Sequence, residues 1–353
     1  MTRVTIVYPN PRGALIADAR AGRAPGTTLL GLDELPRHGL DVQARDSFVD
    51  TRTTLIPKRV RWHVRELTLP WEVGDTDVLF TPLANLIPLT ARARRLPLLV
   101  YNFGLNTILR RGPRARAAAL AASLRQATAV VSLAASQRDE LVELAGVEPA
   151  RAHVALHGVD HRFFTPPEET PREPLVLAIG RDLARDYETF FAAVRDLDVR
   201  VVVVAVRDRN LARLDVPPNV ETREHVRWDE LRRLYRRACC AVISLRRAAH
   251  LYGSEASGLT ALLEAEAMAT PIVATARPVI REYLTHGESA LLVPAEDPAA
   301  LRAAIASLIG DPELARALGK AGRRRIATRH TMDDMAAELA PLLEAAAAVR
   351  RPR

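Results

Sequence analysis

Short runs of β-branched and aliphatic residues alternate with longer helical patterns along the whole chain. Most of these runs are continuously apolar, which is the pattern of strands covered on both faces, as in a parallel sheet. We therefore expect an α/β protein built on doubly wound parallel sheets. The runs occupy residues 4–10, 77–83, 96–104, 127–134, 150–160, 174–180, 199–206, 239–245, 270–276 and 289–295.

The length of the chain favours two domains of this kind. Its 353 residues exceed the usual size of one domain. The Pro- and Glu-rich stretch at residues 163–174 does not continue a helix and predicts a hinge linker. We expect a Rossmann-like domain over residues 1–168 and another over residues 169–330, with their sheet edges facing a central cleft.

Composition excludes several classes of protein. Cys239 and Cys240 are the only cysteines, so the chain can form neither a disulfide framework nor a four-cysteine zinc site. No run of about 18 uncharged apolar residues occurs, and the N-terminus begins with a strand pattern rather than a signal peptide. These features predict a cytoplasmic protein, and leave open a peripheral position on the inner face of the membrane.

The basic character of the chain raises the question of acidic partners. The net charge is +8, and because Lys58 and Lys320 are the two lysines, 48 of the 50 basic residues are arginines. So strong a preference is typical of GC-rich coding. Basic stretches at residues 57–67 and 109–127 are interpreted first as solvated helix faces, then as contacts with anionic lipid or an acidic acceptor. We expect no nucleic-acid partner.

A first candidate binding motif follows the apolar run at residues 174–180. Gly180 ends the expected strand, Arg181 follows it, and Arg185 lies in a short loop before a helix. A glycine there lets backbone amides approach a ligand, and two arginines can donate charge-assisted hydrogen bonds to an anion. The motif suits a pyrophosphate, although surface arginines in an ordinary loop remain the alternative.

A second candidate motif is SEASGLTALLEAEA, residues 254–267. Glu255 precedes Gly258 by three residues, and Glu264 lies in the helix that follows. A carboxylate at a helix start in a cleft can accept hydrogen bonds from neighbouring hydroxyl groups, as in a ribose or a hexose. Solvated glutamates on a helix are the alternative, and Glu266 is expected to be structural or solvated.

Together with residues 155–164, 228–245 and 283–325, these motifs resemble the C-terminal half of a family 4 glycosyltransferase of the GT-B fold. The resemblance covers about 180 residues in matching order and spacing. It implies a retaining, metal-independent enzyme without a cofactor, which transfers a sugar from a nucleotide-diphosphate sugar of UDP or GDP type. It also implies that the N-terminal domain binds the acceptor, and that a helix over residues 331–353 crosses back to that domain.

The resemblance assigns roles to individual residues. Arg181 and Arg185 match the basic pair that binds the donor diphosphate, and Glu255 matches the glutamate that faces the transferred sugar. These three form the expected catalytic set. Glu264 matches the ribose-binding glutamate. The expected donor-binding residues are Gly180, Arg181, Arg185, Gly258, Leu259, Thr260 and Glu264. The expected acceptor is a small molecule, a lipid-linked sugar or a glycan.

The sequence departs from the family pattern at several points. Eight residues rather than seven separate Glu255 from Glu264, and Arg185 is one residue nearer to Gly180 than the usual lysine. The loop after the first strand keeps a single glycine, Gly13. Two alternative functions therefore stay open, a non-catalytic subunit or sensor that binds sugar nucleotides and a nucleotide-sugar epimerase or hydrolase of the same fold.

Asp75 and Asp77 form an Asp-x-Asp motif, which binds metal ions in other glycosyltransferases. Because Asp77 begins an expected strand, we interpret both as structural residues and expect no metal ion. His157 is expected to pack in the turn between the two domains, with a contact to acceptor or sugar as the alternative.

Overall fold

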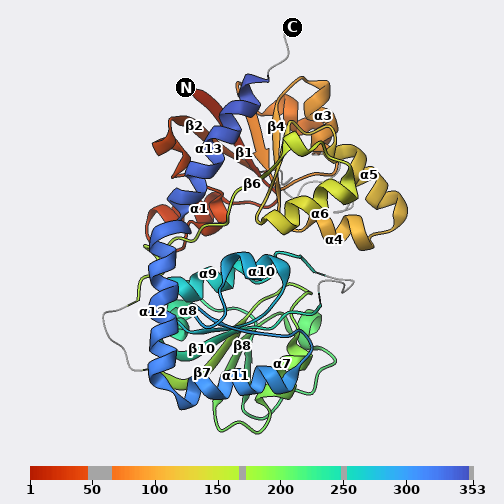
Figure 1. Ribbon diagram of the computed structural model, residues 1–353. Coiled ribbons are helices and arrows are strands. Elements are labelled where there is room, and N and C mark those ends of the chain that lie inside the picture. Colours follow the sequence, from red (N-terminus) through yellow and green to blue (C-terminus); the bar gives the residue numbers. More distant parts are fainter. Residues whose placement is uncertain (47–65, 167–171, 248–252, 350–353) are drawn as a thin grey trace. The chain divides into compact units, whose positions relative to one another are not determined.

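The computed structural model describes residues 1–46, 66–166, 172–247 and 253–349. Contacts within the chain divide it into two compact units, each containing one parallel sheet. Unit 1 comprises Met1–Ala21, Gly26–Leu156 and Met332–Arg353, and unit 2 comprises Gly22–Pro25 and His157–Thr331. The predicted doubly wound α/β architecture is confirmed within each unit (Figure 1).

Unit 1 contains a six-stranded parallel sheet in the order β2-β1-β3-β4-β5-β6. Its strands are β1 (Thr2–Tyr8), β2 (Leu40–Asp46), β3 (Val78–Thr81), β4 (Leu98–Asn102), β5 (Ala129–Ser132) and β6 (Ala152–Val154). Residues 66–72 are helical, and the other helices are α1 (Gly13–Arg20), η1 (Thr27–Leu29), η2 (Leu35–His38), α3 (Ile87–Ala93), α4 (Leu105–Arg111), α5 (Arg114–Leu124), α6 (Ala135–Ala145), η3 (Pro149–Arg151) and α13 (Met332–Ala348).

The last helix, α13, belongs to unit 1. It lies across β1, β3 and β4 and contacts η2 (Figure 1). Met332, Met335, Leu339 and Leu343 form part of its buried face. The final segment of the chain therefore completes the core of unit 1 from a position more than 170 residues beyond β6.

Unit 2 contains a second six-stranded parallel sheet, in the order β12-β11-β10-β7-β8-β9. Its strands are β7 (Glu173–Ile179), β8 (Arg200–Val204), β9 (Val220–Arg223), β10 (Ala238–Ile243), β11 (Ile272–Thr275) and β12 (Leu291–Val293). Its helices are α7 (Tyr187–Val194), η4 (Arg207–Leu211), α8 (Trp228–Arg237), α9 (Leu259–Ala267), α10 (Pro278–Tyr283), α11 (Pro298–Gly310) and α12 (Pro312–Arg329).

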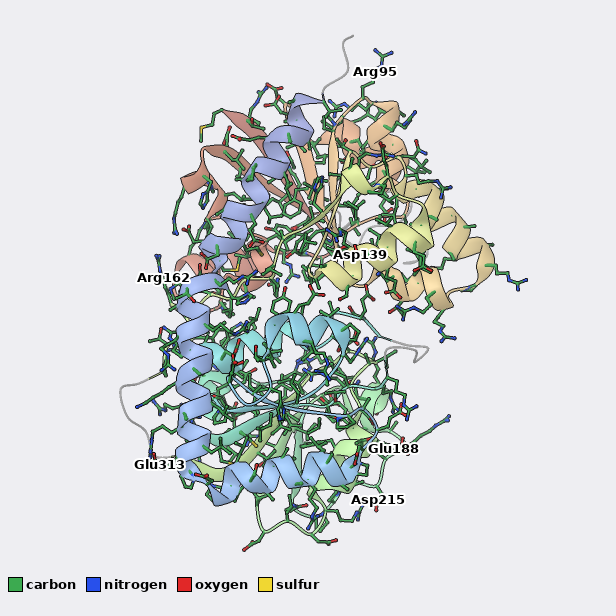
Figure 2. All side chains as sticks on the ribbon, in the orientation of Figure 1. Arg95, Asp139, Arg162, Glu188, Asp215 and Glu313 are labelled. Atoms are coloured by element: carbon green, nitrogen blue, oxygen red, sulfur yellow. The ribbon has the colours of Figure 1, made fainter. Side chains whose placement is uncertain are left out.

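The core of unit 2 lies on both faces of its sheet. Helices α7 and α11 pack on one face, where Phe190 and Ile305 are fully buried. Helices α8 and α9 contact β10, and α9 also packs against α12 (Figure 1). Charged side chains such as Glu188, Asp215 and Glu313 point outward into solvent (Figure 2). The apolar strands are thus enclosed on both faces, as their sequence predicts.

The predicted domain boundary between residues 168 and 169 lies outside the described residues. Contacts divide the chain earlier, because the segment that begins at His157 packs against unit 2. The backbone N–H of His157 donates to Tyr283 Oη at 2.7 Å, and the N–H of Val159 donates to His330 O at 2.9 Å. Arg323 Nη1 donates to the carbonyl oxygen of Phe164 at 3.2 Å.

The structure describes only the second of the two basic stretches in full. Residues 57–65 of the first lie outside the described residues. The second, residues 109–127, contains the end of α4 and all of α5, and Gly112 and Pro113 separate the two helices. In the described part of the chain, no helix combines the length and the apolar character needed to cross a membrane.

Candidate functional site

Gly180, Arg185 and Gly258 come together beside the carboxyl ends of β7 and β10. Arg185 Nη2 donates to the carbonyl oxygen of Ile179, the last residue of β7. A Cβ atom at Gly180 would lie 2.0 Å from Arg185 Nε, and one at Gly258 would lie 3.6 Å from Arg185 Nη1. A side chain at position 180 would therefore displace the Arg185 guanidinium. Gly258, which directly precedes α9, has a φ of 90°, a conformation that favours glycine.

Arg185 is a buried cation with unused hydrogen-bonding capacity. It is 6% exposed, and its Nε has no hydrogen-bond partner in the described part of the chain. No described carboxylate forms an ion pair with it. Burial lowers the pKa of Arg185 because the charged form is removed from water. A buried guanidinium without a counter-ion is costly, so this position favours the binding of an anion.

Arg181 is directed elsewhere. It is exposed, and its Nη2 donates to the carbonyl oxygen of Glu224 at 2.8 Å, with His225 Nδ1 at 3.4 Å. Arg185 instead lies over Gly180, toward α9. The two arginines, predicted to act as a pair, thus share no partner in this structure, and their assignment to a diphosphate stays a prediction.

Glu264 is buried within α9 and accepts a hydrogen bond from Tyr235. The Tyr235 hydroxyl donates to Glu264 Oε2 at 2.9 Å, and Glu264 is 5% exposed. Burial raises the pKa of Glu264 to about 7, while the hydrogen bond from Tyr235 acts in the opposite direction. Burial is also the largest cause of the raised pKa of Tyr235; the charge of Glu264 raises this pKa further, and the charge of Arg185 lowers it. Tyr235 therefore lies within the electrostatic reach of both predicted donor-binding residues.

The remaining predicted residues surround the start of α9. Glu255 is 4% exposed in the turn that precedes the helix, and Leu259, the first helical residue, is 2% exposed. Thr260 Oγ1 lies 3.4 Å from His157 Nε2. Thr260 is thus directed toward the first residues of unit 2, and its role in donor binding stays a prediction.

Sequence reasoning missed Tyr235 and Asp182. Asp182 Oδ1 accepts hydrogen bonds from the backbone N–H groups of Ala184, at 2.9 Å, and Ser254, at 3.0 Å. It therefore joins the loop of Arg185 to the turn that carries Glu255. The sequence signal is an aspartate two residues after a strand-ending glycine, a position where Asp commonly accepts backbone hydrogen bonds. No local signal marks Tyr235, because its partner is 29 residues away.

Several other residues of interest have structural partners. Glu266 is 1% exposed and forms a bidentate ion pair with Arg325 of α12, at 2.7 and 3.1 Å. Asp75 and Asp77 both pair with Arg3. His157 is buried, and burial lowers its pKa to about 4. Among the described residues, no three His, Cys, Asp or Glu side chains lie close enough to hold a metal ion.

Comparison with known proteins identifies the family. A family model described as glycosyl transferases group 1 matches residues 173–311, within unit 2. D-inositol 3-phosphate glycosyltransferase 1 of Catenulispora acidiphila is 30% identical over 287 residues, which cover 69% of this chain and 66% of the relative. The chain belongs to the glycosyltransferases of group 1. The family predicted from the motifs is thereby confirmed.

A second relative of this chain is the MMP alpha-(1->4)-mannosyltransferase of Mycolicibacterium hassiacum. It is 31% identical over 226 residues, which cover 61% of this chain and 53% of the relative. The chain thus matches between about half and two thirds of the length of these two curated relatives.

Solved structures of similar shape confirm the predicted GT-B fold. Sucrose-phosphate synthase from Thermosynechococcus elongatus matches with a TM-score of 0.72 and 18% identity, over 98% of this chain and 99% of that one. The Anabaena protein HepE, solved in complex with UDP and glucose, matches with a TM-score of 0.66 and 14% identity, over 98% and 99%. At this level of identity the likeness concerns the fold.

Proposed function

We propose that this chain is a retaining glycosyltransferase that moves a sugar from a nucleotide-diphosphate sugar, of UDP or GDP type, to an acceptor hydroxyl group without a metal ion. The observation that carries the proposal is the buried guanidinium of Arg185 at the carboxyl end of β7, within the segment that matches the family model. Ligands of parallel α/β sheets bind at this end of the strands. Family membership and the UDP complex of HepE support the same class of donor.

Arg185 and the start of α9 would bind the diphosphate. A helix N-terminus carries a partial positive charge and free N–H groups. As the bond between the anomeric carbon and the phosphate oxygen breaks, negative charge grows on the leaving diphosphate. Because Arg185 is fixed before the reaction, it would stabilise that charge more in the transition state than in the ground state. Glu264 would accept hydrogen bonds from the ribose hydroxyls, and Glu255 would face the sugar.

The proposed step is a substitution on one face of the sugar. The acceptor oxygen forms a bond to the anomeric carbon, while the bond from that carbon to the leaving phosphate oxygen breaks. The proton of the acceptor hydroxyl passes to the leaving phosphate oxygen, so no separate catalytic base is needed. The acceptor is a hydroxyl of a small molecule, a lipid-linked sugar or a glycan.

The test is calorimetric titration of UDP and GDP into the full chain in EDTA. We expect one nucleotide to bind the wild type, and we expect Arg185→Ala to weaken that binding at least tenfold, because hydrogen bonds to charged groups contribute about 1.5–3 kcal/mol. Arg185→Lys retains the charge and should recover part of the affinity. Arg195→Ala removes an exposed arginine that pairs with Asp215 and serves as the control. Equal affinities of wild type and Arg185→Ala would contradict the proposal.

A second candidate function is the binding of sugar nucleotides without transfer. It is favoured by the orientation of Arg181, which leaves one of the two predicted diphosphate ligands bonded to Glu224. The two candidates differ in turnover. Release of free UDP or GDP from the bound nucleotide sugar, dependent on Arg185, supports the transferase, whereas tight binding with no release over hours supports the sensor.

A further inference from the structure

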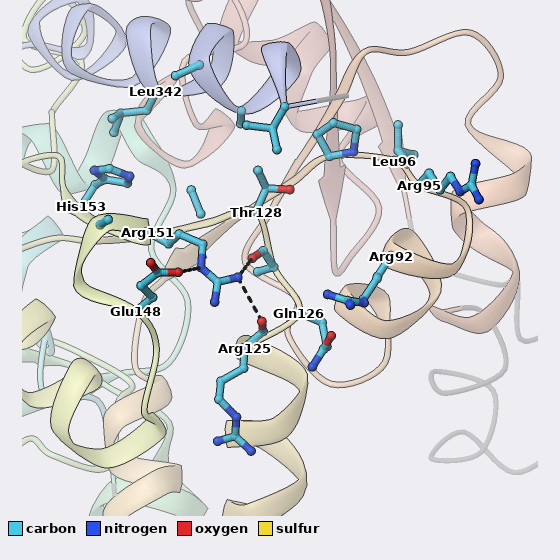
Figure 3. Close-up of a pocket in the computed structure, with 17 residues that line it drawn as sticks. Arg92, Arg95, Leu96, Arg125, Gln126, Thr128, Glu148, Arg151, His153 and Leu342 are labelled. Atoms are coloured by element: carbon cyan, nitrogen blue, oxygen red, sulfur yellow. Dashed lines mark hydrogen bonds and ion pairs between the residues drawn. The ribbon is translucent and has the colours of Figure 1, made fainter. Parts of the chain in front are cut away.

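A cavity of about 720 Å³ lies in unit 1, at the amino ends of β4, β5 and β6 (Figure 3). Its walls come from the loops before β4 and β5, from η3 and from the last turns of α13. This edge of the sheet is opposite to the carboxyl ends, where ligands of parallel sheets usually bind. All of the lining residues belong to unit 1, so the cavity is separate from the proposed donor site.

Arg151 is held in the cavity by fixed contacts. Its Nη1 donates to the carbonyl oxygens of Arg125, at 3.1 Å, and Ala127, at 3.2 Å. Its Nε lies 3.2 Å from Glu148 Oε2 (Figure 3). These contacts fix Nη1 and Nε, and Nη2 has no partner among the described residues. Arg151 is therefore a preoriented donor.

The lining carries an excess of positive charge. Arg92, Arg95, Arg125 and Arg151 line the cavity, and Glu148 is the single carboxylate among the lining residues. Burial lowers the pKa of His153, which is therefore neutral near pH 7. The side chain of Arg92 has neither a hydrogen bond nor an ion pair with any described residue. Figure 3 shows its guanidinium directed toward Gln126 and Arg151, whereas Arg95 lies at the outer edge.

The ordinary role of such arginines is to neutralise helix ends. Arg125 does this, because its Nη1 donates to the carbonyl oxygen of Ala145, the last residue of α6. Each helix C-terminus contributes about half a negative charge, and α3, α5 and α13 end beside the cavity. Together these three ends offset less than two of the guanidinium charges, and the net charge of the lining stays positive.

The opposite wall is apolar. Leu342, Ala345, Ala346 and Val349 of the α13 region face the cavity, together with Leu96 and Pro97. The volume falls within the range of small-molecule sites, about 300–1,000 Å³, and is too large for an inorganic anion alone. Guanidinium groups match the geometry of phosphate oxygens. The lining thus combines phosphate donors with room for an organic body.

We propose that this cavity binds an organic phosphate, with the phosphate between Arg92 and Arg151 and the organic body against α13. Two sources share this chemistry, a soluble sugar phosphate and the headgroup of an anionic lipid. The site depends neither on Arg185 nor on any other residue of the proposed donor site.

The experiment measures two probes with the full chain. Glucose 6-phosphate is titrated calorimetrically, and vesicles of phosphatidylglycerol, with phosphatidylcholine as reference, are tested by cosedimentation. Arg92→Gln removes a charge, and Ala345→Phe fills the cavity from an exposed helical position. Arg111→Gln, in the last turn of α4, and Ala348→Phe, in the last turn of α13, are matched changes at exposed positions outside the lining.

We expect one probe to bind the wild type and to lose at least tenfold in affinity in both Arg92→Gln and Ala345→Phe, with both control variants unchanged. If the two cavity variants lose affinity for glucose 6-phosphate, the ligand is a soluble sugar phosphate. If they lose affinity for phosphatidylglycerol vesicles, the ligand is a lipid headgroup. The proposal is overturned if neither probe binds, if neither cavity variant weakens binding, or if Arg111→Gln weakens it as much as Arg92→Gln.

Discussion

At the scale of single residues, Arg172 satisfies backbone carbonyl groups from two parts of unit 2. Its Nη1 donates to the carbonyl oxygens of Tyr235, at 3.0 Å, and Ala238, at 2.8 Å, and its Nη2 donates to that of Ala269 at 2.5 Å. Burial lowers the pKa of Arg172 to about 10. The side chain thus holds the end of α8 and the end of α9 together.

We predict that Arg172→Ala lowers the free energy of unfolding by about 3 kcal/mol, because it leaves several buried carbonyl groups without donors. Urea unfolding followed by circular dichroism measures this change. Arg200→Ala, which removes an exposed ion pair with Glu221, should cost less than about 1 kcal/mol. A similar small loss for Arg172→Ala would show that water replaces the guanidinium.

Glu264 should make stability depend on pH. Its pKa is raised from 4.5 to about 7 in the folded protein, so between these values the folded state holds a proton that the unfolded chain has released. The free energy of unfolding therefore falls as pH rises through this window and is level above it. From the values 4.5 and about 7, the loss is about 3 kcal/mol.

Glu264→Gln removes this titration. The free energy of unfolding of the variant, relative to wild type, should rise by about 3 kcal/mol between pH 4.5 and pH 8, as measured by urea titration at several pH values. Glu344→Gln changes an exposed glutamate of α13 and should show a constant difference. A constant difference for Glu264→Gln as well would place its pKa near the ordinary value.

Residue types and spacing were enough to predict that Gly180, Arg185 and Gly258 lie close together, whereas their role in donor binding stays a prediction. They were not enough to orient Arg181, whose partner is the backbone of Glu224, 43 residues away. The burial of Glu266 beside Arg325 also depends on a helix that follows much later in the chain. Local patterns indicate which residues stand at the end of a strand, whereas their partners depend on how distant elements pack.

At the scale of elements, α12 lies against the end of α9 because Gly319 has no side chain. A Cβ atom at Gly319 would lie 2.1 Å from the carbonyl oxygen of Ala269. We predict that Gly319→Ala lowers the free energy of unfolding by about 1–3 kcal/mol through overpacking. Gly310, the last residue of α11, would meet no atom within 4 Å, so Gly310→Ala should be neutral or stabilising by up to about 1 kcal/mol.

Thermal and urea unfolding of the two variants distinguish a steric effect from a general effect of glycine in helices. If Gly319→Ala is as stable as Gly310→Ala, then α12 can move away from α9 at little cost, and the close contact is not a constraint on the fold.

Continuous apolar runs predicted most strands because those strands are enclosed on both faces. The apolar runs did not predict β9. It is four residues long, VETR, and none of its residues is buried. It lies at the edge of its sheet beside β8, so one side has no neighbouring strand and the apolar pattern is absent. Short edge strands of this kind are recognised by their pairing, which the sequence does not display.

At the scale of the whole molecule, we expect α13 to stabilise unit 1 but not unit 2. We predict that deletion of residues 332–353 abolishes the protection of β1, β3 and β4 in hydrogen-exchange mass spectrometry, because these strands lose the apolar face of α13. Peptides from β7, β8 and β10 should stay protected, since their core is formed by residues of unit 2. Deletion of residues 350–353 is the control, and protection of both units in the longer deletion would contradict the prediction.

The sequence predicted two Rossmann-like units from chain length and apolar pattern alone. The position of the division was harder to predict, because prolines and glutamates mark only a stretch that does not continue a helix. The contacts that assign His157 and Val159 to unit 2 come from Tyr283 and His330. These partners follow more than 120 residues later in the chain, and no local sequence pattern connects them with His157 and Val159.

The discontinuity of unit 1 has a consequence for synthesis on the ribosome. Its sheet is complete when β6 has been made, but the helix that covers part of that sheet is encoded after residue 331. At about 5–20 residues per second, the intervening 175 residues, 157–331, take roughly 9–35 s to translate. During that interval the nascent chain exposes an apolar surface beside β1, β3 and β4, and it is in this interval that a chaperone would bind it.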